Sequence, residues 1–99
     1  MTEPSSLRYR IEDELSRGRI VAEGEGGEAE LTFSKAGTAR IIADHTLVPD
    51  AMGGQGVGTE LVRRLHDYAA ERDVKVVALC PFVKAKMAKR PEWQDVLDH

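Results

Sequence analysis

The sequence predicts a small α/β (α+β) domain in which a mixed, mostly antiparallel sheet includes one strand–helix–strand unit. Two observations carry this prediction. The first half of the chain alternates apolar and polar residues between short glycine turns, which is typical of antiparallel strands. The second half carries an amphipathic helix and then a short apolar run, and two strands joined through a helix run parallel. A length of 99 residues leaves room for a single domain.

The composition excludes several classes of protein. Lys and Arg number 14 against 17 Asp and Glu, so the net charge is −3 and no nucleic-acid partner is expected. No apolar run approaches the roughly 18–20 residues of a membrane span, and Met1–Arg10 lacks the apolar segment of a secretory signal. The single cysteine, Cys80, excludes an internal disulfide and a cysteine-based zinc cluster. We therefore expect a cytoplasmic protein with no metal site and no membrane partner.

Four strands are expected in the first half, after a loose terminus over residues 1–7. They are predicted at Tyr9–Asp13, Gly18–Ala22, Glu28–Phe33 and Thr38–Val48. Alternation along the fourth places Ile41, Ala43 and His45 on one face, and Pro49 ends this strand because it has no N–H for a ladder. An edge strand such as Gly18–Ala22 could pair with a second copy, so a monomer and a weak dimer both remain open.

The second half is predicted to begin with a helix from about Gly56 to Arg72. Its buried stripe is expected to be Val57, Leu61, Leu65, Tyr68 and Ala69. The nearly continuous apolar run Val74–Leu79 predicts a strand that is buried on both faces. Phe82–Lys89 and Pro91–Leu97 are expected to form two short helices.

A glycine-rich loop opens the long helix. The dinucleotide fingerprint is incomplete, because Thr59 occupies the position of its third glycine. The nucleotide P-loop is incomplete as well, because Thr59 occupies the position of its lysine. An acyl-CoA loop, [QR]-x-x-G-x-[GA], matches in part: Gly56 and Gly58 fit, whereas Gly53 replaces its first residue. Small residues and free helical N–H groups would suit a pyrophosphate, with Arg63 and Arg64 adding charge at the rim. A plain turn before a helix is the alternative.

Cys80 and His45 are the candidates for chemistry. Cys80 ends the apolar strand just before a helix, where the helix N-terminus stabilises a thiolate. His45 lies near the end of the neighbouring strand, so its imidazole is expected near the thiol, as a base that activates a nucleophile. The alternatives are a cysteine that only packs and a half-buried strand histidine.

Two charged runs are weaker candidates, because each is more often a solvated face. A basic run could meet the phosphates of a coenzyme; it comprises Lys84, Lys86, Lys89 and Arg90. An acidic strip could attract a cationic substrate; it comprises Glu23, Glu25, Glu28 and Glu30.

Four segments in this order resemble the small single-domain members of the GNAT N-acetyltransferase superfamily, over roughly residues 29–97. They are His45–Pro49, Gly54–Thr59, Leu79–Val83 and Pro91–Trp93. The resemblance implies one acyl-CoA N-acyltransferase-like domain over residues 1–99, binding acetyl-CoA in a V-shaped opening between two parallel strands. It assigns catalysis to Cys80 and His45. The coenzyme contacts that we expect are Leu47, Val48, Gly53, Gly54, Gln55, Gly56, Val57, Gly58, Thr59, Pro81, Phe82 and Lys86.

The chain also departs from similar sequences. Lys86 stands where they tend to carry an aromatic residue, and Arg90 where they carry a histidine. If a tyrosine there normally protonates the departing CoA thiolate, Lys86 or water must replace it. From the resemblance as a whole we expect an acetyl-CoA-dependent N-acetyltransferase acting on an amine of a small molecule, peptide or protein. The alternative is a CoA-binding module that regulates or docks without turnover.

Overall fold

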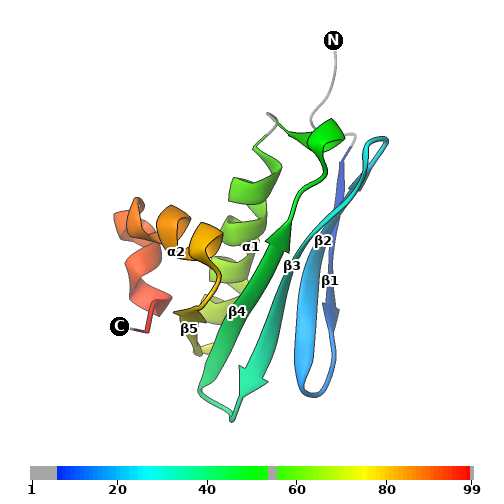
Figure 1. Ribbon diagram of the computed structural model, residues 1–99. Helices are drawn as coiled ribbons and strands as arrows, with labels where there is room; N and C mark the ends of the chain where they lie inside the picture. Colours follow the sequence, from blue (N-terminus) through cyan, green and yellow to red (C-terminus); the bar gives the residue numbers. More distant parts are fainter. Residues whose placement is uncertain (1–6, 54–55, 99) are drawn as a thin grey trace.

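The computed structural model describes residues 7–53 and 56–98, which form a five-stranded sheet covered by helices on one face (Figure 1). The strands are β1 (Arg8–Asp13), β2 (Arg17–Gly24), β3 (Gly27–Ala36), β4 (Arg40–Leu47) and β5 (Lys75–Ala78). The helices are α1 (Val57–Arg72) and α2 (Pro81–Ala88), with 3-10 turns η2 (Asp50–Met52) and η3 (Pro91–Val96). The sheet order is β1-β2-β3-β4-β5; β4 and β5 are parallel and the other pairs antiparallel. The predicted fold class is confirmed.

Glycine makes the turns of the antiparallel part possible. Gly24, the last residue of β2, pairs with Gly27, the first residue of β3, and Gly27 has a φ of 121°. Gly37, with a φ of 70°, begins the turn between β3 and β4. Both values lie in the region where a side chain is strained. The first turn falls where it was predicted, whereas β3 runs on to Ala36 and moves the second turn to residues 37–39.

The core lies between the sheet and α1. The predicted stripe of α1 is confirmed, because all five of its members are at most 3% exposed. They meet apolar side chains of β2 and β3, of which Ile20, Leu31 and Phe33 are fully buried. The Phe33 and Tyr68 rings lie 5.0 Å apart. In the part of the chain that is described, no helix has the length and apolar character needed to cross a bilayer.

β5 is an edge strand, and this changes its burial. Its parallel pairing with β4 confirms the strand–helix–strand unit. The expected burial on both faces is wrong, because Val76 is buried but Leu79, just beyond the strand, is 67% exposed. Beyond β5 the described chain adds a single bridge, Val76 to Leu97. Gly18–Ala22, which was expected as an edge, lies inside β2 between two strands.

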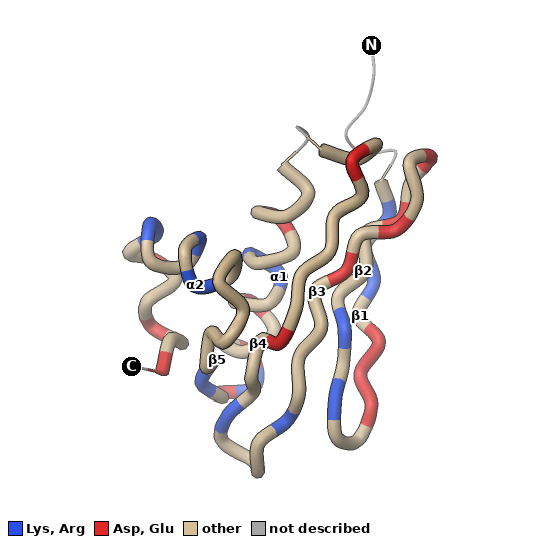
Figure 2. Tube along the Cα trace, viewed as in Figure 1, with Lys and Arg blue, Asp and Glu red and all other residues tan. Residues whose placement is uncertain are grey.

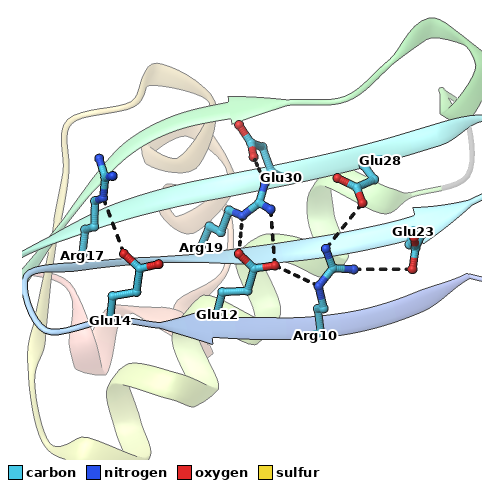
Figure 3. A network of polar contacts seen from close by, with 8 residues as sticks. All are labelled: Arg10, Glu12, Glu14, Arg17, Arg19, Glu23, Glu28 and Glu30. Atoms are coloured by element: carbon cyan, nitrogen blue, oxygen red, sulfur yellow. Dashed lines mark hydrogen bonds and ion pairs between the residues drawn. The ribbon is translucent and has the colours of Figure 1, made fainter.

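The face of the sheet that points away from the helices is a network of ion pairs (Figure 3). Arg19 lies 2.7 Å from Glu12 and 2.6 Å from Glu30, and Arg10 contacts Glu12 at 3.0 Å. Arg10 also lies 3.4 Å from both Glu23 and Glu28. The hydrogen bonds from Arg19 and Arg10 hold the pKa of Glu12 below its usual value. The acidic strip is therefore largely paired with arginine, and its predicted pull on a cationic substrate loses its basis.

A substitution at Gly18 tests the packing of β2 against its two neighbouring strands. A Cβ at this position would lie 2.6 Å from Cζ of the fully buried Phe33 and 2.9 Å from the backbone oxygen of Glu12. We expect Gly18→Ala to lower the free energy of unfolding by about 1–3 kcal/mol in urea denaturation, because neither neighbour can retreat. Leu15→Ala, at a side chain that is 96% exposed, is the control and should change it by less than about 0.5 kcal/mol. A Gly18→Ala protein as stable as the parent would refute this packing.

Candidate active site

The candidate site is an opening where β4 and β5 part. The two strands pair from Arg40 and Lys75 to Ala43 and Ala78. One more bond follows, from the Cys80 N–H to the Ala43 carbonyl at 2.9 Å. β4 then continues to Leu47, whereas the chain after β5 turns into α2 (Figure 1). Within the described residues, the last half of β4 therefore has a strand partner only on its β3 side.

A β-bulge in β4 lies where the strands part. Phe33 of β3 pairs with Ala43, but the preceding residue, Thr32, pairs with His45. Asp44 is therefore the extra residue of the bulge, and its carboxylate accepts a hydrogen bond from the Ser34 hydroxyl at 2.6 Å. An extra residue reverses the alternation of every side chain that follows it.

The bulge corrects the predicted position of His45. His45 does not share the face of Ile41 and Ala43; it lies opposite Thr32, on the outer face, and is exposed. Thr46 takes its place on the helix-covered face, opposite the buried Leu31. The structure therefore does not bring His45 and Cys80 together as predicted.

Cys80 lies at the start of α2, facing Thr46. It is 6% exposed, and its Sγ lies 3.5 Å from the Thr46 hydroxyl. Burial raises the pKa of the Cys80 thiol, but hydrogen bonds from the Thr46 hydroxyl and from the backbone of Val83, Phe82 and Thr46 together outweigh burial. The net pKa lies below the usual value of a cysteine. Thr46 is thus the residue that sequence reasoning missed, since its role depends on a bulge that leaves no mark in the alternation.

The first turn of α1 supplies unpaired backbone donors. Gly56 precedes the helix with a φ of 73°, has no side chain to cap it, and accepts the Glu60 N–H at 3.0 Å. By helix geometry the N–H groups of Val57, Gly58 and Thr59 have no partner within the helix. No described atom lies within 4 Å of the position that a Cβ of residue 56 would take. Gly54 and Gln55, also predicted for this loop, lie outside the described residues, while Gly53 is exposed beside them.

A close contact joins the beginnings of the two helices. A Cβ on Gly58 would lie 2.5 Å from Cζ of Phe82, so the missing side chain lets the Phe82 ring lie against α1. The Lys86 Nζ is 5.5 Å from the centroid of that ring. The predicted coenzyme residues Phe82 and Lys86, from α2, thus lie beside the first turn of α1, and Pro81 is exposed at the start of α2.

Three exposed apolar side chains lie on the segments that border the opening, and of these Leu47 is opposite Glu30 and points to the outer face of the sheet. Leu47 is 52% exposed at the end of β4, Leu79 is 67% exposed after β5, and Phe82 is 36% exposed at the start of α2. Val48 is half-buried against the core. Large apolar side chains left in water often mark a binding surface when they cluster.

Arg63 and Arg64 of α1 are both engaged with neighbouring side chains. Arg63 pairs with Glu60 and Asp67, and Arg64 bonds Glu60 at 2.9 Å with its guanidinium 4.2 Å from the centroid of the Tyr9 ring. Hydrogen bonding to Arg63 lowers the pKa of Glu60, although burial opposes it. The expectation that Arg63 and Arg64 add charge at the rim is therefore not supported by their contacts.

Thr46 gives a direct test of the thiol environment. Thr46→Val keeps the shape of the side chain and removes its hydroxyl, so we expect the pKa of Cys80 to rise. The readout is the pH at which the ultraviolet absorbance of the thiolate appears, with Cys80→Ala as the blank. Thr32→Val is the matched control, because the Thr32 hydroxyl bonds the His45 carbonyl on the other face of the sheet. Equal midpoints in the parent and Thr46→Val proteins would contradict the assigned contact.

Comparison with known proteins gives a consistent result. Residues 17–96 match the model of the family described as GCN5-related N-acetyl-transferase. Protein NATD1 of Xenopus tropicalis is 25% identical over 92% of this chain and 84% of its own length, and Protein NATD1 of Mus musculus is 27% identical over 91% and 87%. The solution structure of a GCN5-like protein from Staphylococcus aureus superposes with a TM-score of 0.70 at 32% identity, covering 95% of this chain and 90% of that one. The chain belongs to the GCN5-related N-acetyltransferase family.

Proposed function

We propose that this protein is an N-acetyltransferase that takes the acetyl group of acetyl-CoA and transfers it to an amine. The observation that carries the proposal is the opening beyond Ala43 and Ala78, around which a low-pKa thiol, exposed apolar side chains and a helix N-terminus gather. Membership of the family supports the same coenzyme.

The residues at the first turn of α1 fit a pyrophosphate. The N–H groups of Val57, Gly58 and Thr59 point out of the helix end, where the helix dipole favours negative charge. The open space at Gly56 lets a phosphate approach the backbone closely. The Lys86 Nζ lies 5.5 Å from the centroid of the Phe82 ring, which packs against Gly58, so its ammonium would add positive charge near this turn.

The residues beyond the bulge fit the pantetheine arm. Leu47 and Val48 follow the part of β4 that β5 does not pair with, so their backbone groups would serve an extended ligand. The exposed side chain of Phe82, beside α1, would cover apolar segments of the arm. Bound acetyl-CoA would supply the acetyl group as a thioester.

Cys80 would act in one of two ways. In a covalent route its thiolate bonds the acetyl carbon, the CoA sulfur departs as a thiolate, and the amine then displaces Cys80. In a direct route the amine attacks the thioester and the Cys80 thiol gives its proton to the departing sulfur. The proton that the amine loses then returns to Cys80 through water. The lowered pKa suits both, because it makes the group a readier thiolate and a stronger acid.

His45 keeps a different role from the one that the sequence suggested. Since it lies on the outer face, it would serve as a base only for an amine that arrives from that side. Its neighbour Asp44 lines a hollow of about 360 Å³ there with Thr32 and Ser34, and the charged side chains of Glu12, Glu14, Arg17 and Arg19 also line it. This hollow is the candidate place for an acceptor.

The helix N-terminus can be tested without disturbing the fold. Thr59→Glu puts a carboxylate at the third position of α1, where it stabilises a helix but repels a phosphate. We expect calorimetry to show acetyl-CoA binding weakened about tenfold or more, with thermal stability retained. Thr38→Glu, in the exposed turn between β3 and β4, is the control with the same charge change. Equal weakening in both variants, or in neither, would contradict a coenzyme site at this turn.

Turnover separates the enzyme from a module that only binds. We expect CoA to be released from acetyl-CoA when amines, polyamines or basic peptides are added, above the uncatalysed rate. Saturable binding without such release would instead support a CoA-binding regulatory or interaction module. Lys86 favours that alternative, because the position then lacks a tyrosine hydroxyl to protonate the departing thiolate.

Cys80→Ala distinguishes the two routes. For the covalent route we expect one acetyl adduct in the intact mass of the parent protein, no adduct in Cys80→Ala, and turnover lowered by at least about a hundredfold. The direct route predicts no adduct and a partial loss. Unchanged turnover in Cys80→Ala would remove Cys80 from the chemistry altogether.

A further inference from the structure

β1 is the edge of the sheet farthest from the candidate site. It pairs with β2 along its whole length, from Arg8 opposite Glu23 to Asp13 opposite Gly18. Within residues 7–53 and 56–98 no strand lies on its other side. An edge of this kind offers unpaired backbone groups to any chain that can align with them.

The charges of β1 are separated along its length (Figure 2). Arg8 and Arg10 occupy its first half, and Glu12 follows in its second half, with Glu14 just after the strand. These four residues alternate with the side chains that point to the helices, so they share the outer face. Ile11, at the centre, points to the other face, opposite the buried Ile20, and remains 43% exposed.

This pattern is complementary to itself in one orientation. If a second copy pairs antiparallel about a two-fold axis at Ile11, Arg10 lies opposite the partner's Glu12 and Arg8 opposite the partner's Glu14. Arg10 and Glu12 are already paired within each copy, so these contacts would extend the existing ion-pair network across the axis. Ile11 then lies opposite the partner's Ile11. A parallel alignment in the same register would set like charges side by side, which destabilises a strand pair.

We propose that β1 is a homodimer interface, in which two copies join their sheets edge to edge around Ile11. Each charged or apolar pair across such strands stabilises the pairing only modestly. A strand of six residues buries much less than the roughly 800 Å² per partner of a typical stable interface. The dimer is therefore weak and depends on concentration. Because β1 and β5 are at opposite ends of the sheet order, the opening between β4 and β5 stays free in the dimer. The hollow beside Asp44 is lined by Glu12 and Glu14 at the β1 edge, so the dimer would border it.

Sedimentation velocity at protein concentrations up to about 1 mM tests the interface. We expect the mean mass to rise toward that of a dimer in the parent and to stay that of a monomer in Ile11→Lys, which sets two ammonium groups together on the axis. Leu15→Lys is the matched control, since Leu15 is 96% exposed in the turn just beyond β1, and it should behave as the parent. A monomer at every concentration, or a dimer that survives Ile11→Lys, would overturn the proposal.

Cross-linking tests the register. In a Cys80→Ser background, Ile11→Cys should form an intermolecular disulfide on mild oxidation, because the two side chains are directly opposite. Arg10→Cys should not form one, because residue 10 lies directly opposite the partner's Glu12. The two cysteines at position 10 would be diagonal neighbours, which are too far apart for a disulfide. Leu15→Cys, the most accessible of the three, reports random collision. Equal cross-linking of all three would reject the register and the two-fold axis with it.

Discussion

β4 has strand partners on both sides as far as Ala43 and, in the described chain, only the β3 partner beyond it. The bulge at Asp44 coincides with this change. A bulge bends and twists a strand, so the continuation of β4 leaves the direction that β5 follows. The β5 chain, held to Ala43 by the Cys80 N–H, turns into α2 instead. The opening, the position of the thiol and the exposure of Leu47 and Leu79 all depend on this break in pairing.

A second contact makes the opening one site. Gly58 lacks the atom that would meet the Phe82 ring, so the first turn of α1 and the start of α2 approach closely. One helix then brings free N–H groups and the other a cysteine and Lys86 to the same region. Cys80 is almost fully buried yet has a lowered pKa, because its hydrogen bonds outweigh its loss of water. The open helix end after Gly56, the close contact at Gly58 and the bulge at Asp44 thus bring the candidate phosphate site and the candidate reactive thiol together.

Much of this architecture was predictable from local pattern. Alternation located β2, β3 and most of β4, and the helical period gave the buried face of α1. The helix predicted from Phe82 begins one residue earlier, at Pro81. The direction of the β4 side chains beyond Ala43 was not predictable. The extra residue in β4 reverses their alternation, and only the pairing of β4 with β3 shows where that residue is inserted. For this reason Thr46, and not His45, lies on the helix-covered face of the sheet. The exposure of Leu79 and the pairing of Glu30 with Arg19 depend in the same way on neighbours that are distant in the chain.

The central claim is that the opening between β4 and β5 receives the coenzyme. Amide chemical shifts of the labelled protein, recorded as acetyl-CoA is added, test it most directly. The largest shifts are expected at Val57–Thr59, at Leu47 and Val48, and around Cys80, with little change along β1. Shifts confined to the outer face of the sheet, or no saturable shifts at all, would contradict the assignment of this opening as the coenzyme site.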